Sequence, residues 1–209
     1  MTETVPVPTL PEALILIDYF GIAVFAVSGA LLAAERRQTL VTFIFFAVVT
    51  GVGGGTIRDL LIGAPVFWMH TNSTLLICFA AALLVWIASR HRFAGQALLW
   101  FDAAGLAAYA TYGAAKALGW GVAPVPAFAM GAITACAGGI IRDVLAGEPS
   151  ILMRPELYVT AAALAAGLFV ALSLLGVSLP LAALLAAVAG FALRGLAIAR
   201  GWSLPAYRD

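Results

Sequence analysis

Seven long apolar runs dominate the sequence and leave little chain between them. Each run is close to the roughly 20 residues that an α-helix needs to cross a bilayer. Apolar residues occupy all sides of the runs, whereas the strands of a membrane β-barrel alternate apolar and polar residues. The sequence therefore predicts an all-α membrane protein with seven transmembrane helices, at about residues 14–34, 40–60, 74–89, 97–118, 126–146, 157–176 and 180–199.

Composition supports this fold class and excludes several functions. Of the 209 residues, 64% are hydrophobic and only 10% are charged, against about a quarter charged in a soluble domain. The net charge is +1 and no basic tract is present, so we expect no nucleic-acid partner. Cys78 and Cys136 both lie inside apolar runs, so we expect neither a disulfide nor a metal site there. The whole chain, residues 1–209, is expected to form a single transmembrane domain.

The distribution of arginines predicts the orientation in the membrane. With seven spans, one face collects nine arginines and also holds the C-terminus, while the other face carries only Arg58 and Lys116. Positively charged residues concentrate on the cytoplasmic side of membrane proteins. We therefore expect the N-terminus outside and the C-terminus in the cytoplasm.

The sequence contains an internal repeat. A shift of 84 residues aligns 14–65 with 98–149 without a gap, and 18 of the 52 aligned pairs are identical. Each copy holds three spans, and because three is odd the second copy must enter the membrane from the opposite side. The prediction is two inverted three-helix repeats, at about 14–90 and 97–176, followed by a seventh helix at about 180–199 that has no counterpart.

A glycine cluster recurs in both repeats, and each cluster follows a threonine. The first consists of Thr50 with Gly53, Gly54 and Gly55, and the second of Thr134 with Gly138 and Gly139. Each glycine costs a helix about 1 kcal/mol relative to alanine. One interpretation is a helix break whose freed backbone groups face an ion path. The other is close helix packing through small residues. Duplication at matched depth favours the break.

Ionisable residues at membrane depth form a second duplicated set: Asp18, Arg58, Asp59, Asp102, Arg142 and Asp143. Such residues are costly in a bilayer and usually face a cavity or a partner of opposite charge. The inverted topology places Asp18 near Arg58 on one side and Asp102 near Arg142 on the other. We predict these two ion pairs, which serve as structural salt bridges, as pore-lining groups, or as both.

Lys116 breaks the symmetry, because its repeat partner is Leu32. Near a helix end, a lysine commonly extends its side chain to the membrane surface. Since its partner is apolar, Lys116 is also a candidate for lipid binding or gating.

The sequence contains none of the patterns that would indicate an enzyme. His70 and His91 fall in loops on opposite faces, so neither is placed as a general base or metal ligand inside the membrane. No phosphate-binding loop or dinucleotide-binding fingerprint is present. We expect no catalytic residues, no metal and no cofactor.

The segments at 53–61 and 138–145, in two three-span repeats followed by a seventh helix, resemble the bacterial branch of the trimeric intracellular cation (TRIC) channel family. Bacterial members are also catalogued under a glycine-transporter domain name. The resemblance implies a homotrimer in the bacterial inner membrane, surrounded by membrane lipids. It also implies one potassium-permeable pore per protomer, lined mainly by the first, second, fourth and fifth spans and kinked at the two glycine clusters.

The functional prediction is therefore a channel for monovalent cations, with potassium and sodium as permeant ions. The alternative is a secondary transporter of a small zwitterion such as glycine, because inverted repeats are common among transporters. A scaffold without transport would not account for the duplicated glycines.

Overall fold

The computed structural model describes residues 11–88 and 94–205. Arg90, His91, Arg92 and Arg208, which entered the predictions above, lie outside the described residues. The described chain forms seven α-helices: α1 Glu12–Glu35, α2 Leu40–Leu61, α3 Asn72–Ala88, α4 Ala94–Gly119, α5 Pro124–Leu145, α6 Val159–Leu174 and α7 Leu179–Arg200. Each predicted span is confirmed, with boundaries within three residues. Short 3-10 turns, η1 Phe67–Met69 and η2 Ile151–Met153, precede α3 and α6.

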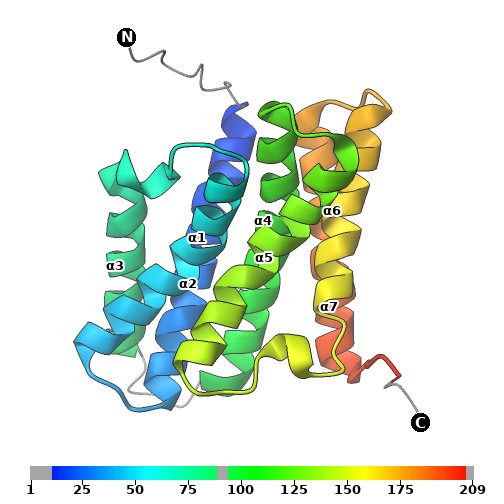
Figure 1. Ribbon diagram of the computed structural model, residues 1–209. Helices are drawn as coiled ribbons and strands as arrows, with labels where there is room; N and C mark the ends of the chain where they lie inside the picture. The colour runs from blue at the N-terminus through cyan, green and yellow to red at the C-terminus, as the bar shows by residue number, and fades with distance from the viewer. Residues whose placement is uncertain (1–10, 89–93, 206–209) are drawn as a thin grey trace.

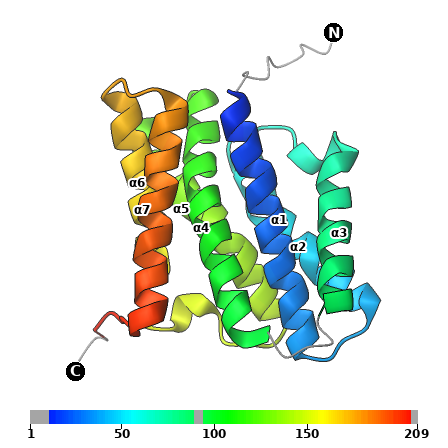
Figure 2. The same ribbon diagram turned by 180° about the vertical axis from the view of Figure 1, so that it is seen from behind.

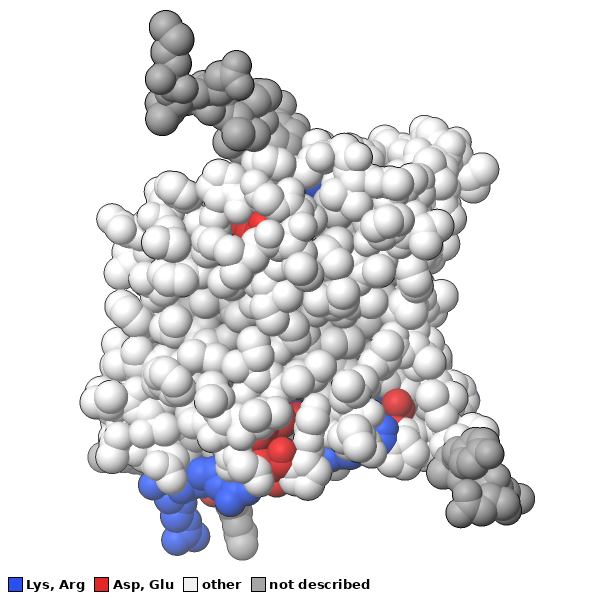
Figure 3. Space-filling model, in the orientation of Figure 1, with Lys and Arg blue, Asp and Glu red and all other residues white. Residues whose placement is uncertain are grey.

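Length and composition alone mark four of these helices as membrane spans, namely α1, α2, α5 and α7. The apolar helices α3 and α6 are shorter, with 17 and 16 residues. With 17 residues, α3 reaches the lower end of the range of about 17–25 residues that crosses a bilayer, and α6 is one residue shorter. The face of the molecule in Figure 3 is apolar over most of its height, as a membrane protein requires, and its charged residues gather mainly along the lower edge.

The two repeats run in opposite directions, as predicted. In Figures 1 and 2, α1 descends from the upper face, whereas its repeat partner α4 ascends from the lower face. The four helices α1, α2, α4 and α5 pack against one another in the centre, while α3 lies against α1 and α2 and α6 lies against α4 and α5. This arrangement is the inverted three-helix repeat.

The seventh helix packs mainly on the second repeat, against α6 and α4, and makes a small contact with α1 of the first repeat. Small residues on α7 permit this contact, since Ala182 and Ala186 are fully buried. A methyl group added at Gly190 would lie 2.7 Å from the Ala165 side chain. The molecule therefore has a symmetric core and one asymmetric addition.

Turn geometry repeats as well. Gly63 follows α2 and Gly147 follows α5, and both have a φ of +70°. Glycine adopts this left-handed conformation without the steric cost that a Cβ brings, so it is favoured just after a helix. Both turns lead directly into the segments that carry η1 and η2.

Candidate functional site

The centre of the molecule is a close crossing of α2 and α5. A methyl group at Gly138 would lie 2.6 Å from the carbonyl oxygen of Thr50, and one at Gly54 would overlap the carbonyl oxygen of Thr134. Both threonines are fully buried. Only glycine permits two helix backbones to approach so closely. The two glycine clusters thus meet where the two repeats meet.

The predicted helix breaks at these glycines are wrong. Both α2 and α5 are α-helical without interruption from Leu40 to Leu61 and from Pro124 to Leu145. Consequently the expected row of freed carbonyl groups does not form. The low helix propensity of glycine, about 1 kcal/mol per residue, is offset by tight packing with the neighbouring helix. The packing interpretation describes these residues correctly.

The remaining glycines of the clusters make room for side chains. A methyl group at Gly53 would lie 3.0 Å from Ile141, and one at Gly55 would lie 2.6 Å from the Phe67 ring. On the other helix, a methyl group at Gly139 would lie 2.6 Å from the Tyr158 hydroxyl. These close approaches bring the loop that carries η1 and the start of α6 against the crossing.

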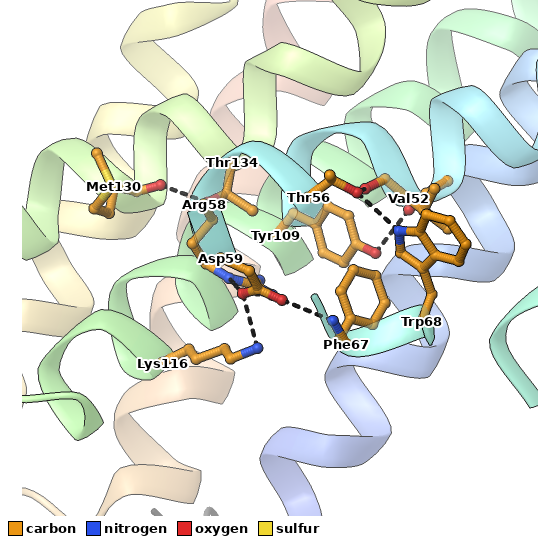
Figure 4. Close-up of polar contacts among 11 residues, drawn as sticks. Val52, Thr56, Arg58, Asp59, Phe67, Trp68, Tyr109, Lys116, Met130 and Thr134 are labelled. Atoms are coloured by element: carbon orange, nitrogen blue, oxygen red, sulfur yellow. Dashed lines mark hydrogen bonds and ion pairs between the residues drawn. The ribbon is translucent and has the colours of Figure 1, made fainter. Parts of the chain in front are cut away.

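The upper charge cluster forms around Asp59 (Figure 4). Its Oδ1 accepts hydrogen bonds from Arg58 Nε and from Lys116 Nζ, both at 2.8 Å. Its Oδ2 accepts the backbone N–H of Phe67 at 3.0 Å. Arg58 is 0% exposed. A buried guanidinium at membrane depth needs this kind of compensation.

Aromatic rings cover the rest of the Arg58 guanidinium. Its central carbon lies 5.1 Å from the centre of the Tyr112 ring and 5.7 Å from that of Phe67. The face of an aromatic ring attracts a cation, and more strongly where water is excluded. Tyr112 therefore contributes to this cluster although sequence reasoning did not select it.

The predicted ion pair between Asp18 and Arg58 is wrong. Asp18 is 8% exposed, and its Oδ1 has no hydrogen-bond partner. Arg58 instead bonds to Asp59, the next residue on its own helix. The physical reason is that Tyr112 of the second repeat lies over the guanidinium, whereas its repeat partner in the lower cluster is the small Ser28 on α1. The bulky ring contacts Arg58 where the lower half has a hydrogen bond from Arg142 to the Ser28 hydroxyl.

Lys116 does not extend to the membrane surface. It is 9% exposed, and its ammonium group binds Asp59. The lysine on α4 thereby links the second repeat to the charge cluster of the first. The expectation that the Lys116 side chain extends to the membrane surface is therefore wrong, because the buried carboxylate of Asp59 lies within its reach.

The lower charge cluster contains the second predicted ion pair. Arg142 Nη1 lies 2.6 Å from Asp102 Oδ1, which confirms this pair, and Arg142 Nε donates to Asp143 at 2.9 Å. Arg142 also donates to the hydroxyl of Ser28 on α1. With 1% of its surface exposed, Arg142 joins α1, α4 and α5 inside the protein.

The two clusters share one motif that the sequence analysis missed. Asp143 Oδ2 accepts the backbone N–H of Ile151 at 2.9 Å, as Asp59 Oδ2 accepts that of Phe67. Phe67 and Ile151 are equivalent under the 84-residue shift and lie two residues beyond the aligned segment. Extending the alignment would have found the pair, although not the role of its backbone.

A third buried arginine lies on α7. Arg194 is 1% exposed and donates to Glu156 Oε2 at 2.6 Å. Its guanidinium carbon lies 5.3 Å from the centre of the Tyr158 ring. The topology prediction treated Arg194 only as a charge at the cytoplasmic face. In the structure it fixes the seventh helix to the segment before α6.

Within the described residues, no group of three histidine, cysteine, aspartate or glutamate side chains could hold a metal ion. Cys78 and Cys136 are both buried and free. The chemistry of the interior is therefore that of paired charges, hydroxyl groups and aromatic rings.

Comparison with known proteins identifies relatives of the chain. A family model described as glycine transporter matches residues 15–90 and 99–174, one match in each repeat. A membrane protein of Vibrio cholerae serotype O1 is 47% identical over 151 residues, which are 71% of this chain and 63% of the relative. The inner membrane protein YadS of Escherichia coli strain K12 is 41% identical over 148 residues, which are 69% of this chain and 72% of that protein. The chain thus spans less than two thirds of the Vibrio protein.

A solved structure decides the family. The TRIC channel orthologue from Rhodobacter sphaeroides is 41% identical and superposes with a TM-score of 0.88, over 92% of this chain and 100% of that chain. The chain belongs to the bacterial TRIC channel family. As expected from the sequence, this TRIC relative is described as a cation channel and not as an enzyme. The TRIC fold also accounts for the seventh helix without a repeat partner, since the superposition covers nearly the whole chain.

Proposed function

We propose that this TRIC family member is a channel for monovalent cations, conducting potassium and sodium passively. The proposed path runs inside one protomer, between α1, α2, α4 and α5. Its two ends are the upper cluster around Asp59 and the lower cluster around Arg142. Its middle is the crossing of Gly54 and Gly138, with Thr50 and Thr134 beside it.

One observation carries this proposal. Oxygen atoms of Asp18, Thr50 and Asp102 are buried between the four central helices, and none of the three has a hydrogen-bond partner in the protein: Asp18 Oδ1, Thr50 Oγ1 and Asp102 Oδ2. Buried polar atoms are nearly always satisfied, because leaving one unpaired costs about 1–3 kcal/mol. Water molecules and permeating cations would supply the missing partners.

The charge balance supports a path for cations. Arg58 and Arg142 alone would repel a positive ion. Asp59 neutralises Arg58, and Asp102 and Asp143 together exceed the charge of Arg142. A cation close to the lower cluster would therefore experience attraction. The relative from Rhodobacter sphaeroides, described as a cation channel, supports the same class of permeant ion.

The proposal includes the assembly and its orientation. We propose a homotrimer with one pore in each protomer, embedded in the lipids of a bacterial inner membrane, with the N-terminus outside and the C-terminus in the cytoplasm. The trimer is supported by the name of the solved relative, and the membrane by the name of the Escherichia coli protein. The orientation is supported by the excess of arginine on one face.

A second candidate is a secondary transporter of a small zwitterion such as glycine. It is favoured by the description of the matching family model and by the inverted repeats. Flux measurements on sealed proteoliposomes separate the two candidates. A channel gives rapid potassium efflux that is not saturable by glycine, together with no concentrative glycine uptake. Saturable, gradient-driven glycine uptake without potassium efflux would replace the channel by the transporter.

A further inference from the structure

Besides the difference between Tyr112 and Ser28, the two charge clusters differ at the position of Lys116. In the upper half, the ammonium group of Lys116 lies 2.8 Å from Asp59 Oδ1. The equivalent residues in the lower half are Leu32 and Asp143. A leucine has no charge to offer, so Asp143 has no counterpart of the lysine ammonium beside it.

A cavity occupies the corresponding place in the lower half. It has a volume of about 200 Å³, and its walls include Leu32, Asp143 and Ile151. These three residues are the repeat partners of Lys116, Asp59 and Phe67, which lie together in the upper cluster. The symmetry of the fold therefore places this cavity where the upper half holds a positively charged side chain.

The lower cluster also has one positive charge fewer than the upper cluster. The upper cluster contains two carboxylates, of Asp18 and Asp59, and two cations, Arg58 and Lys116. The lower cluster contains two carboxylates, of Asp102 and Asp143, but among the residues that the structure describes only one buried cation, Arg142. The lower cluster thus has one uncompensated negative charge. Placing a cation next to it would lower the free energy of the folded state.

The rim of the cavity does not cancel this charge. Besides Asp143 and Arg142, which belong to the lower cluster, the charged residues Glu35, Glu148 and Arg154 line it, and Glu148 forms an ion pair with Arg36. The negative charge of Glu35 is then offset by the positive charge of Arg154. The excess negative charge remains at Asp102 and Asp143.

We propose that the cavity between Leu32 and Asp143 binds one monovalent cation, at the position that corresponds to the Lys116 ammonium group of the other repeat. Potassium and ammonium ions have the compact single charge that fits this place. Lys116 is then a tethered cation in the upper half, and the lower half takes its cation from solution. That permeating ions bind at this site rests on the proposed channel function. Whether a cation occupies the site can be measured without measuring ion flux.

The test compares thermal unfolding of the purified protein in potassium chloride and in N-methyl-D-glucamine chloride at equal ionic strength. The charged nitrogen of the organic cation carries two carbon substituents, so it cannot take the place of a compact ammonium group as potassium can, and the comparison removes general effects of salt. For the unsubstituted protein we expect the melting temperature to rise by several degrees with potassium and, above the dissociation constant, to keep rising with the logarithm of the potassium concentration, as ligand binding to the folded state requires.

The deciding variant is Leu32→Lys, which supplies a second tethered cation. We expect its melting temperature to be independent of potassium, because the new ammonium group occupies the site. The matched control Leu32→Met adds a flexible apolar side chain of similar size and should keep the full potassium-dependent shift. An unchanged potassium-dependent shift in Leu32→Lys would overturn the proposal.

A second variant keeps the test decisive if Leu32→Lys does not fold. Glu35 is exposed at the rim, so Glu35→Gln removes a charge without disturbing the core. The potassium concentration at which the melting temperature begins to rise should increase several-fold, and an unchanged onset contradicts the site. Single-channel recording separates the two claims. Potassium-dependent stabilisation without current contradicts only the channel, whereas current without stabilisation contradicts only the cation site.

Discussion

Arg142 and Asp102 face each other across α5 and α4 with a nitrogen–oxygen distance of 2.6 Å, and both are almost completely buried. Their mirror positions, Arg58 and Asp18, make no such contact, since Arg58 turns to Asp59. The two repeats thus hold their equivalent arginines, Arg58 and Arg142, through different contacts. This difference gives the first prediction its control.

Neutralising one partner of the lower pair should be strongly destabilising. Asp102→Asn leaves Arg142 without one of its two carboxylates, and loss of one partner from a buried ion pair costs about 3–5 kcal/mol. We expect the double variant Asp102→Asn, Arg142→Gln to lose less than the sum of the single losses. Denaturation in detergent measures all four states of the cycle.

The matched control is Asp18→Asn in the upper half. Because Asp18 Oδ1 has no hydrogen-bond partner, its neutralisation should reduce stability much less than Asp102→Asn does. Equal losses at the two aspartates, or additive effects in the lower cycle, would contradict the account of the clusters.

The glycines at the helix crossing should not tolerate even a methyl group. Gly138→Ala brings a Cβ to 2.6 Å from the Thr50 carbonyl oxygen, and the backbone there belongs to a packed helix. We expect a loss of about 1–3 kcal/mol, as is typical of overpacking. Gly167→Ala on α6 is the control, because its Cβ would only reach Phe128 at 3.5 Å. That change should be neutral or stabilise by up to about 1 kcal/mol. A thermally unchanged Gly138→Ala protein would show that the crossing is not tight.

Thr50 offers a test of the path with little effect on the fold. Its hydroxyl has no protein partner, so Thr50→Val should leave the melting temperature almost unchanged. If the hydroxyl faces the permeating ions, the potassium conductance should fall. Ser173→Ala on α6, outside the proposed path, is the control, since the Ser173 hydroxyl donates to the Phe169 carbonyl oxygen on its own helix at 2.8 Å. Equal conductance in both variants would remove Thr50 from the path.

The attachment of the seventh helix depends on a buried arginine. Glu156→Gln removes the carboxylate that lies 2.6 Å from Arg194, and a hydrogen bond to a charged group contributes about 1.5–3 kcal/mol. We expect a stability loss in that range. Glu148→Gln breaks the exposed pair with Arg36 and should change stability by less than about 1 kcal/mol. Chemical denaturation in potassium-free buffer compares the two variants. A larger loss for Glu148→Gln would contradict the role of Arg194.

Much of this fold follows from the sequence, because bilayer thickness and the repeat leave few alternatives. The spans, the inverted topology and the pairing of Asp102 with Arg142 were all predicted from apolar runs and an 84-residue shift. The rest depends on how each helix is rotated about its axis. A helix that is apolar on all sides carries no periodic signal for that rotation.

Two errors illustrate this limit. The inward direction of Lys116 depends on Asp59, a residue in the other repeat, and sequence spacing does not reveal that contact. A glycine cluster can break a helix or admit a neighbour, and the choice depends on what lies across from it. At Gly54 the neighbour is the Thr134 backbone, so the helix stays intact.

Single-channel recording of the purified protein in a planar bilayer is the most direct test of passive cation conduction. With a potassium gradient and no glycine, we expect stepwise currents that reverse near the potassium equilibrium potential and that fall in amplitude in Thr50→Val. A bilayer that stays silent in potassium, while the same preparation accumulates glycine in vesicles with saturable kinetics, would contradict the account.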